Sequence, residues 1–328
     1  MIITQTPVRI SFLGGGTDYP AHYRRFGGET LACSINKYTY VTLHTVTRFA
    51  DYRLRVHYSQ VESAKTLDEI QHPSARECLR FMQIGGGVEV HYVSDLPART
   101  GLGSSSSATV GLLHALHAFK GQITSREQLA AEAVVVEQEL IRERVGSQDQ
   151  YASALGGLLH LHFREDGAVQ AHRIPLSRQK MDEMRSHMLL LYTGVQRQAH
   201  VVLEEQVART EAGENTACLL EMRELVKRGA AVLADWDLVR FGEILHESWL
   251  LKCRLSSRIS NPWIDGLYAR GRQAGAIGGK LLGAGAGGFL LLWVPPAQRV
   301  SVCHALSELQ EADFAFDHSG SQVIFYQT

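Results

Sequence analysis

The chain has 328 residues, 45% hydrophobic and 20% charged, which is typical of a globular protein with one large or two ordinary domains. Its 33 basic and 34 acidic side chains nearly cancel, so neither nucleic acid nor a membrane surface is predicted as a partner, although a local basic pocket is compatible with this balance. Five cysteines without a CxxC pair argue against a disulfide framework or a cysteine-based zinc site. The N-terminus does not resemble a signal peptide and no apolar run is long enough to span a membrane, so we expect a cytoplasmic protein.

Hydrophobic periodicity predicts strands and helices in mixed order along the chain. The first half is predicted to contain strands at 8–12, 39–46, 54–58, 88–93 and 156–163, and helices at 67–82, 108–119 and 126–144. The second half is predicted to contain a strand at 188–192, three or four helices between 200 and 274, a strand at 289–294, a helix at 297–309 and a strand at 323–326. Because there is no strict βαβ repetition, the predicted class is α+β in two lobes, residues 1–175 and 176–328.

The first of three glycine-rich segments follows the first predicted strand. Arg9 interrupts the apolar alternation of that strand, which leads into the three glycines 14–16 and then Thr17 and Asp18. Glycines without a Cβ allow the backbone to approach a ligand closely. On these residues alone, a β-turn with a surface arginine and aspartate is an equally good interpretation.

The second segment contains two glycines and four serines at the start of a predicted helix: Gly101, Leu102, Gly103, Ser104, Ser105, Ser106 and Ser107. We expect the serines to cap the helix, and its first amides to remain free. Free amides and a helix dipole of about half a charge form an anion site, and a serine hydroxyl could bind Mg²⁺. The alternative is a capped helix without a ligand, but two glycines with four serines exceed what a cap requires.

The third segment, residues 278–288, contains the spacing GxGxxG. A strand rather than a helix is predicted after it, which argues against a dinucleotide-binding fingerprint. Lys280 is followed by Leu281 rather than Ser or Thr, so it is not a P-loop either. The segment is therefore either a flexible hairpin loop or a loop whose missing side chains allow close packing against the other glycine loops or a substrate.

One further acidic residue, Asp149, follows a break in helical periodicity at Gly146. An acid in that place could orient a hydroxyl and accept its proton. The charged residues 137–144 before it are otherwise typical of a solvated helix face, so on sequence alone a catalytic role is the minority interpretation.

Two histidine pairs, His114 with His117 and His160 with His162, each share one face of a predicted element. Neither pair has a third ligand or an HExxH frame in the sequence, so metal binding is not predicted for them. The HRD and DFG elements of protein kinases are absent.

The phrases PVRISFLGGGTDYP, PARTGLGSSSSA and KLLGAGAGGF, in this order, strongly resemble the GHMP kinase superfamily, named for galactokinase, homoserine, mevalonate and phosphomevalonate kinases. The resemblance covers essentially the whole chain, and the middle phrase is the most specific. GGGTDYP, INKYTYV and GSQDQYASALGG further resemble the D-glycero-D-manno-heptose 7-phosphate kinases. Galactokinases carry a Glu-His pair where Gly15 and Gly16 stand here, which argues against galactose and for a roomier pocket.

The resemblance implies a first lobe like ribosomal protein S5 domain 2, a ferredoxin-like second lobe, and ATP bound at residues 101–107. It implies Mg²⁺ held by Ser105 and Glu137, with Glu139 as the alternative to Glu137. Asp149 would accept the proton of the sugar's C1 hydroxyl, and Arg9 would neutralise charge beside it. The resemblance places the substrate against these residues: Gly15, Gly16, Thr17, Asp18, Gly283, Gly285 and Gly287.

The implied product is the heptose 1,7-bisphosphate, made from a small-molecule sugar phosphate. Six cations are candidates for holding the 7-phosphate: Arg53, Arg55, Arg197, Lys252, Arg254 and Arg258. Other interpretations are a GHMP kinase for fucose or galactose, a non-catalytic sugar sensor of the same fold, and an S5-like nucleic-acid module, which the neutral charge disfavours. The sequence is compatible with a homo-oligomer but does not determine the oligomeric state.

Overall fold

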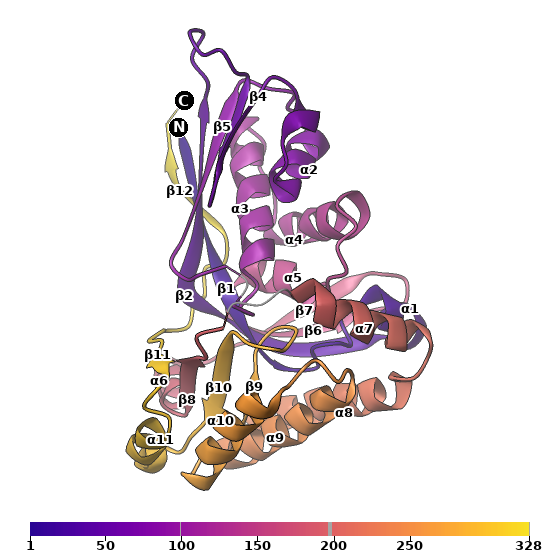
Figure 1. Cartoon of the computed structure of the whole chain (residues 1–328), viewed down its shortest axis with the longest axis vertical. Coiled ribbons are helices and arrows are strands. Elements are labelled where there is room, and N and C mark those ends of the chain that lie inside the picture. Colours follow the sequence, from indigo (N-terminus) through magenta and orange to yellow (C-terminus); the bar gives the residue numbers. More distant parts are fainter. Residues whose placement is uncertain (99, 196–198, 328) are drawn as a thin grey trace.

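The computed structural model describes residues 1–98, 100–195 and 199–327, which form two lobes stacked along the long axis of the molecule (Figure 1). The first lobe is built on an eight-stranded sheet and the second on a four-stranded sheet. This arrangement confirms the predicted α+β class with two lobes. Within the described ranges, no helix is both long and apolar enough to cross a membrane.

The first sheet has the strand order β12-β1-β2-β5-β3-β4, and β6 and β7 extend it from β2. Its strands are β1 (Ile2–Leu13), β2 (Gly28–Thr45), β3 (Leu54–His57), β4 (Val61–Ala64), β5 (Val88–Ser94), β6 (Leu158–Phe163), β7 (Val169–Ile174) and β12 (Gln322–Tyr326). β2 pairs with β6 through its first half and with β5 through its second half. The register between β1 and β2 shifts after Pro7, which has no N–H to donate to a partner strand.

Helices cover one face of this sheet (Figure 1). They are α1 (Pro20–Phe26), α2 (Pro73–Phe81), α3 (Ser104–Phe119), α4 (Arg126–Val135) and α5 (Gln148–Leu155), with a 3₁₀ turn η1 (Leu67–Glu69) and a π-helical turn η2 (Val136–Leu140). The predicted helix 67–82 is divided because Pro73 begins α2, a position where a missing N–H costs nothing. The predicted helix 126–144 ends earlier, at Leu140.

The second sheet has the order β11-β8-β10-β9. The lobe contains α6 (Arg178–Ser186), β8 (Met188–Tyr192), α7 (Ala199–Glu211), α8 (Thr216–Ala234), α9 (Leu238–Arg254), α10 (Pro262–Gln273), β9 (Gly278–Leu281), β10 (Phe289–Trp293), η3 (Pro296–Gln298), α11 (Arg299–Ala305) and β11 (Gln310–Glu311). Counted within this sheet the order is 4-1-3-2 with helices after the first and third strands, which is the ferredoxin-like pattern.

The end of the chain returns to the first lobe. β12 pairs antiparallel with β1, and the two termini lie side by side at the upper end of the molecule (Figure 1). The predicted division assigned all of residues 176–328 to the second lobe, but β12 belongs to the sheet of the first lobe. Sequence alone could not show this, because a strand's periodicity carries no information about which sheet it joins.

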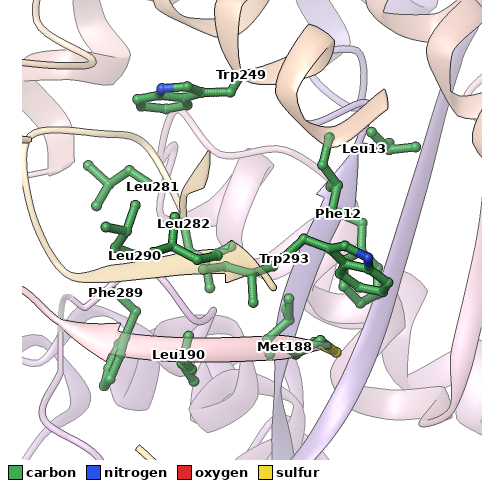
Figure 2. Close-up of a cluster of buried hydrophobic side chains, with 14 of the residues drawn as sticks. Phe12, Leu13, Met188, Leu190, Trp249, Leu281, Leu282, Phe289, Leu290 and Trp293 are labelled. Carbon is green, nitrogen blue, oxygen red and sulfur yellow. The ribbon is translucent and has the colours of Figure 1, made fainter. Parts of the chain in front are cut away.

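The lobes share a hydrophobic core at the lower end of β1 (Figure 2). Phe12 is fully buried and makes edge contacts with Phe241 of α9 and Trp293 of β10, with ring centroids 5.7 and 6.4 Å apart. The Trp293 indole N–H donates to the Leu238 carbonyl at 2.8 Å, which satisfies its only polar atom. β1 is therefore fixed in both lobes, and so are the residues just before and after Phe12.

Candidate active site

A cleft of about 1620 Å³ opens beside this junction. Most of the residues singled out from the sequence line it: Arg9, Gly15, Gly16, Asp18, Gly101, Gly103, Ser104, Ser105, Ser106, Asp149 and Gly283. The first, second and third glycine segments and the Asp149 segment therefore meet at one place, although up to 274 residues separate them. The volume exceeds that of a typical single-ligand pocket and suits two substrates side by side.

Arg9 and Asp149 form the central contact of the cleft. The guanidinium donates from Nε to Oδ1 at 2.8 Å and from Nη2 to Oδ2 at 2.7 Å, a bidentate pair. Its third nitrogen, Nη1, donates to the Gly101 carbonyl at 2.7 Å. Arg9 is buried while the Asp149 side chain stays 23% exposed toward the cleft. One arginine therefore links β1, the second glycine segment and α5, and holds the carboxylate in a fixed orientation.

The glycine-serine segment begins α3, but the expected serine cap does not form. The N-cap position is Gly103, with a left-handed φ of 77° and no side-chain capping bond. A Cβ on Gly103 would lie 3.1 Å from Asp149 Oδ2, so glycine also permits the close approach of this loop to the acid. No side chain of the described residues caps the first amides of α3, and Ser104, Ser105 and Ser106 line the cleft, an arrangement that favours an anionic ligand.

The four serines have different environments. Ser104 and the exposed Ser105 line the cleft, whereas the Ser107 hydroxyl is buried and donates to the Thr6 carbonyl at 2.9 Å. Ser106 donates to Glu137 Oε2 at 2.9 Å, so the structure brings Ser106 rather than Ser105 to Glu137. The proposed role of Ser105 as a metal ligand stays a prediction.

Glu137 lies in the π-helical turn and is 1% exposed. Its Oε2 also accepts a bond from Gln150 at 2.5 Å, while its Oε1 has no hydrogen-bond partner among the described residues. Burial raises the pKa of this carboxyl to about 7. A buried carboxylate oxygen without a partner, next to a serine hydroxyl at the cleft, fits a hard divalent cation such as Mg²⁺. Neither Glu137 nor Glu139 lines the cleft itself, but Glu137 is bonded to Ser106, which does, whereas Glu139 is exposed.

The first glycine loop divides into a structural part and a part that lines the cleft. The Thr17 hydroxyl lies 2.7 Å from the Glu29 carbonyl oxygen and accepts from the Glu29 N–H at 3.1 Å, and the side chain is fully buried. Thr17 therefore holds the loop against β2 and does not line the cleft. Gly15 and Gly16 do line it.

Asp18 lies 1% exposed at the floor of the cleft. Its carboxylate accepts from the N–H of Gly16 at 2.9 Å and from the N–H of Gln148 at 3.4 Å. Desolvation raises its pKa, and the nearby charge of Asp149 adds to this effect. A Cβ on Gly146 would lie only 1.8 Å from Asp18 Oδ2, so the carboxyl occupies space that any other residue at 146 would fill.

The third glycine loop closes the cleft from the second lobe. Gly283 lines it, and its carbonyl accepts a bond from Lys252 Nζ of α9. Gly285 and Gly287 instead allow tight packing, because a Cβ would meet Ile259 at 2.6 Å and Val195 at 3.0 Å. These two glycines shape the loop and do not line the cleft, so a direct substrate contact by either stays a prediction.

Two buried polar groups that the sequence did not single out also face the cleft. Ser11 Oγ and Gln148 Oε1 line it and have no hydrogen-bond partner among the described residues. Buried polar groups are nearly always paired, so these two are candidates to bind substrate hydroxyls. Their only signal in the sequence is their position beside Arg9 and Asp149.

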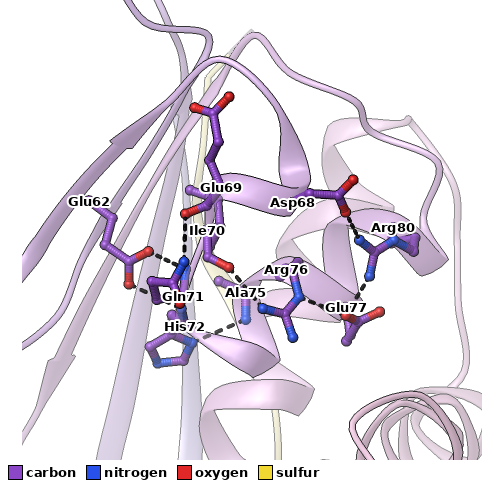
Figure 3. A network of polar contacts seen from close by, with 10 residues as sticks. All are labelled: Glu62, Asp68, Glu69, Ile70, Gln71, His72, Ala75, Arg76, Glu77 and Arg80. Atoms are coloured by element: carbon purple, nitrogen blue, oxygen red, sulfur yellow. Dashed lines mark hydrogen bonds and ion pairs between the residues drawn. The ribbon is translucent and has the colours of Figure 1, made fainter.

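A polar network shapes the far end of the cleft (Figure 3). The Glu62 carboxylate of β4 accepts from the backbone N–H groups of Gln71 and His72 at 2.5 and 3.0 Å. His72 in turn accepts from the Ala75 N–H and so caps α2. Its ring stacks on Tyr92 with centroids 5.2 Å apart, which leaves two flat aromatic surfaces along this end.

Two protein-family models match this chain. The GHMP kinases N-terminal domain matches residues 71–157 and the GHMP kinases C-terminal domain matches residues 230–312, together just over half of the chain. The chain belongs to the GHMP kinase family, whose members use ATP, and it is a sugar kinase of that family.

Individual relatives support the same assignment. The D-glycero-alpha-D-manno-heptose 7-phosphate kinase of Campylobacter jejuni is 26% identical over 97% of both chains. The L-fucokinase/L-fucose-1-P guanylyltransferase of Bacteroides fragilis is 28% identical over 88% of this chain and 34% of its own length. The crystal structure of a D-glycero-D-manno-heptose 1-phosphate kinase from Bacteroides thetaiotaomicron superposes over 100% of both chains with a TM-score of 0.80 and 21% identity, which shows a common fold.

Replacing Glu137 with Gln should change how stability depends on pH. A carboxyl whose pKa is near 7 when folded and 4.5 when unfolded stabilises the fold below pH 4.5, and this stabilisation is lost as the pH rises through 7. In urea unfolding of the ligand-free protein, the free energy of unfolding of the wild type should fall by about 2 to 3 kcal/mol relative to that of Glu137→Gln between about pH 5 and pH 8. Glu139→Gln, an exposed change nearby, is the control; parallel wild-type and Glu137→Gln profiles would contradict the assignment.

Gly146→Ala should displace Asp18 and weaken acceptor binding. The added methyl overlaps Oδ2, so KM for the sugar should rise at least about tenfold while the Kd of ATP changes less than about twofold. Gly266→Ala in α10, where a Cβ meets nothing within 4 Å, is the matched control. An unchanged sugar KM in Gly146→Ala would show that Asp18 does not contact the acceptor.

Proposed function

We propose that this kinase transfers the γ-phosphoryl group of ATP to the C1 hydroxyl of D-glycero-D-manno-heptose 7-phosphate, which yields the 1,7-bisphosphate. The observation that carries the proposal is the bidentate Arg9–Asp149 pair where the glycine segments meet, because it supplies a proton acceptor and a cation at one point. The heptose substrate rests on similarity to the Campylobacter enzyme along nearly its whole length.

Phosphoryl transfer requires positioning and charge neutralisation more than covalent chemistry. The free amides at the start of α3 would bind the phosphates of ATP, and the His72 and Tyr92 rings offer a stacking surface for its base. Glu137 and a neighbouring serine would hold Mg²⁺, which when bound neutralises charge on the phosphates. Binding of a cation should remove the proton that burial favours on Glu137.

The acceptor hydroxyl would lie against Asp149. Both carboxylate oxygens accept from Arg9, and each keeps a second lone pair that can take the C1 proton. Arg9 remains positively charged throughout and stabilises the charge that develops on the transferring group. Asp18 and the unpaired Ser11 and Gln148 atoms would bind sugar hydroxyls and set the orientation of C1.

The lining of the cleft supports some candidates for the 7-phosphate seat over others. Of the six cations proposed from the sequence, Lys252 lines the cleft, while Arg197 lies outside the described residues. Arg55 stacks on the Tyr52 ring and Arg258 pairs with Glu205, and neither arginine lines the cleft. The remaining two, Arg53 and Arg254, do not line the cleft either.

Two other arginines, Arg142 and Arg144, line the cleft beside Gly146 and the Asp18 carboxyl. Arg142 has a left-handed φ of 62°, an uncommon conformation for a residue other than glycine, which turns the chain sharply after η2. Among the described residues, Arg144 makes one loose surface ion pair, with Glu204 at 3.6 Å. We therefore propose Arg144, with Arg142 and Lys252 nearby, as the seat of the 7-phosphate.

Asp149→Asn should lower kcat by at least about 100-fold while the Kd of ATP stays within about twofold, because only the proton acceptor is lost. ADP release should be measured with Mg²⁺-ATP and heptose 7-phosphate, unphosphorylated heptose, fucose and galactose. Fast turnover with a plain sugar would keep the kinase and reject the heptose 7-phosphate. Turnover of Asp149→Asn within a few-fold of wild type would reject the base.

Arg144→Ala should discriminate between phosphorylated and plain acceptors. Loss of one charged hydrogen bond of about 1.5 kcal/mol should raise KM for heptose 7-phosphate by about tenfold and leave KM for unphosphorylated heptose unchanged. Arg254→Ala, an exposed arginine at the end of α9, is the control. Equal effects of Arg144→Ala on both acceptors would contradict a phosphate-specific role.

A further inference from the structure

A second group of ligating side chains lies on the neighbouring strands β2, β3 and β5 of the first sheet. His44 of β2 is directly opposite Glu89 of β5 in their antiparallel register. His91 follows Glu89 by two residues and so shares its face, and His57 of β3 is opposite His91 in the parallel register. Sheet pairing alone therefore brings three imidazoles and one carboxylate together.

Neighbouring residues on these strands alternate with the four. Leu43, Val56 and Val90 are at most 1% exposed and point into the helix-covered core. The side chains of His44, His57 and His91 are 38, 28 and 33% exposed, so solvent reaches them, while Glu89 is 10% exposed beneath them. A small ligand can enter from solvent without displacing any part of the core.

The ligating atoms are already close to one another. Glu89 Oε1 lies 2.8 Å from His57 Nε2 and 3.0 Å from His91 Nε2, and Oε2 lies 3.9 Å from His44 Nε2. The ligand atoms of His44, Glu89 and His91 all lie within 4.8 Å of one another. Tetrahedral coordination with bonds of about 2.0–2.1 Å requires ligand atoms roughly 3.3 Å apart. The His57 ring stacks on the His91 ring with centroids 4.0 Å apart and an interplanar angle of 9°, so the His57 ring must turn toward the ion to complete a set of four ligands. Tyr52 donates to Glu89 Oε2 at 3.1 Å and fixes the carboxylate from behind.

The group around Glu89 differs from a similar group in the same sheet, because no arginine forms an ion pair with its carboxylate among the described residues. The only other such group among the described residues is Glu29, His160 and His162, which supplies the third ligand that the sequence did not reveal for the second histidine pair. There Arg223 donates to Glu29 Oε1 at 3.2 Å, so a cation already neutralises the carboxylate. In the described part of the chain, the ion pairs of Glu89 involve only the three histidines.

We propose that His44, His57, His91 and Glu89 form a binding site for a divalent transition-metal ion of the zinc class. Neutral imidazoles with one carboxylate are ligands that suit Zn²⁺, Co²⁺ or Ni²⁺ and that Mg²⁺ disfavours, so the site is separate in chemistry from the kinase cleft. The ion joins β2, β3 and β5. The next residue of β5, Tyr92, faces the opposite side and lines the far end of the cleft, so the ion stiffens the wall of that cleft from outside.

The test uses the full chain without a polyhistidine tag, stripped of metal by a chelator and titrated with Zn²⁺ calorimetrically in excess Mg²⁺. The expected result is one ion bound per chain in the wild type and binding at least about tenfold weaker in His91→Asn and in His57→Asn. His162→Asn, in the group that Arg223 neutralises, is the matched control and should bind like the wild type. Turnover with Mg²⁺-ATP should be equal in all metal-free variants, which shows that they fold.

Substitution of Co²⁺ gives an independent readout, since a site with imidazole ligands shows a visible absorption band that Mg²⁺ sites lack. That band should be present in the wild type and absent in His91→Asn. The proposal is overturned if the wild type binds no Zn²⁺ under these conditions, if His91→Asn binds it as tightly as the wild type, or if His162→Asn removes the binding.

Discussion

Strand β1 is the constraint on which both lobes depend. It lies between β2 and β12 in the first sheet. Near its C-terminal end, the Phe12 side chain packs in the core of the second lobe. A strand fixed at both ends leaves its intermediate residues no freedom to rotate, because the pleat sets their direction. Arg9 lies in this fixed stretch, so its guanidinium meets Asp149 without the entropy cost that a surface arginine would pay.

Glycine has three separate uses around the cleft. At Gly103 it allows a left-handed turn that leaves the first amides of α3 without a side-chain cap, at Gly146 it leaves room for the Asp18 carboxyl, and at Gly285 it lets the third loop pack on Ile259. Only the first use leaves polar groups open to a ligand. The others position groups that line the cleft, which is why glycine-rich segments are necessary here even where no glycine contacts a substrate.

Three acidic groups in or next to the cleft differ in their environments. Burial raises the pKa of Asp18 and Glu137, whereas Asp149 is partly exposed and paired with Arg9. Burial makes a carboxyl easier to protonate, and such a group can bind a cation or a substrate hydrogen bond, while a carboxylate held open to the cleft by an arginine can accept a proton. Under the proposed function, this difference would divide binding and proton transfer between neighbouring acids.

By itself the sequence determined the α+β class, most strands and helices, and the four segments that meet in the cleft, because hydrophobic periodicity and glycine are local signals. Tertiary structure decided which sheet β12 joins, that Ser106 rather than Ser105 contacts Glu137, and that Thr17 holds the loop while Ser11, Gln148 and Arg144 line the cleft. It also brought Glu89 to three histidines from three strands. These outcomes depend on register and on which side of an element faces a partner, and neither is encoded in the spacing of residues within one segment.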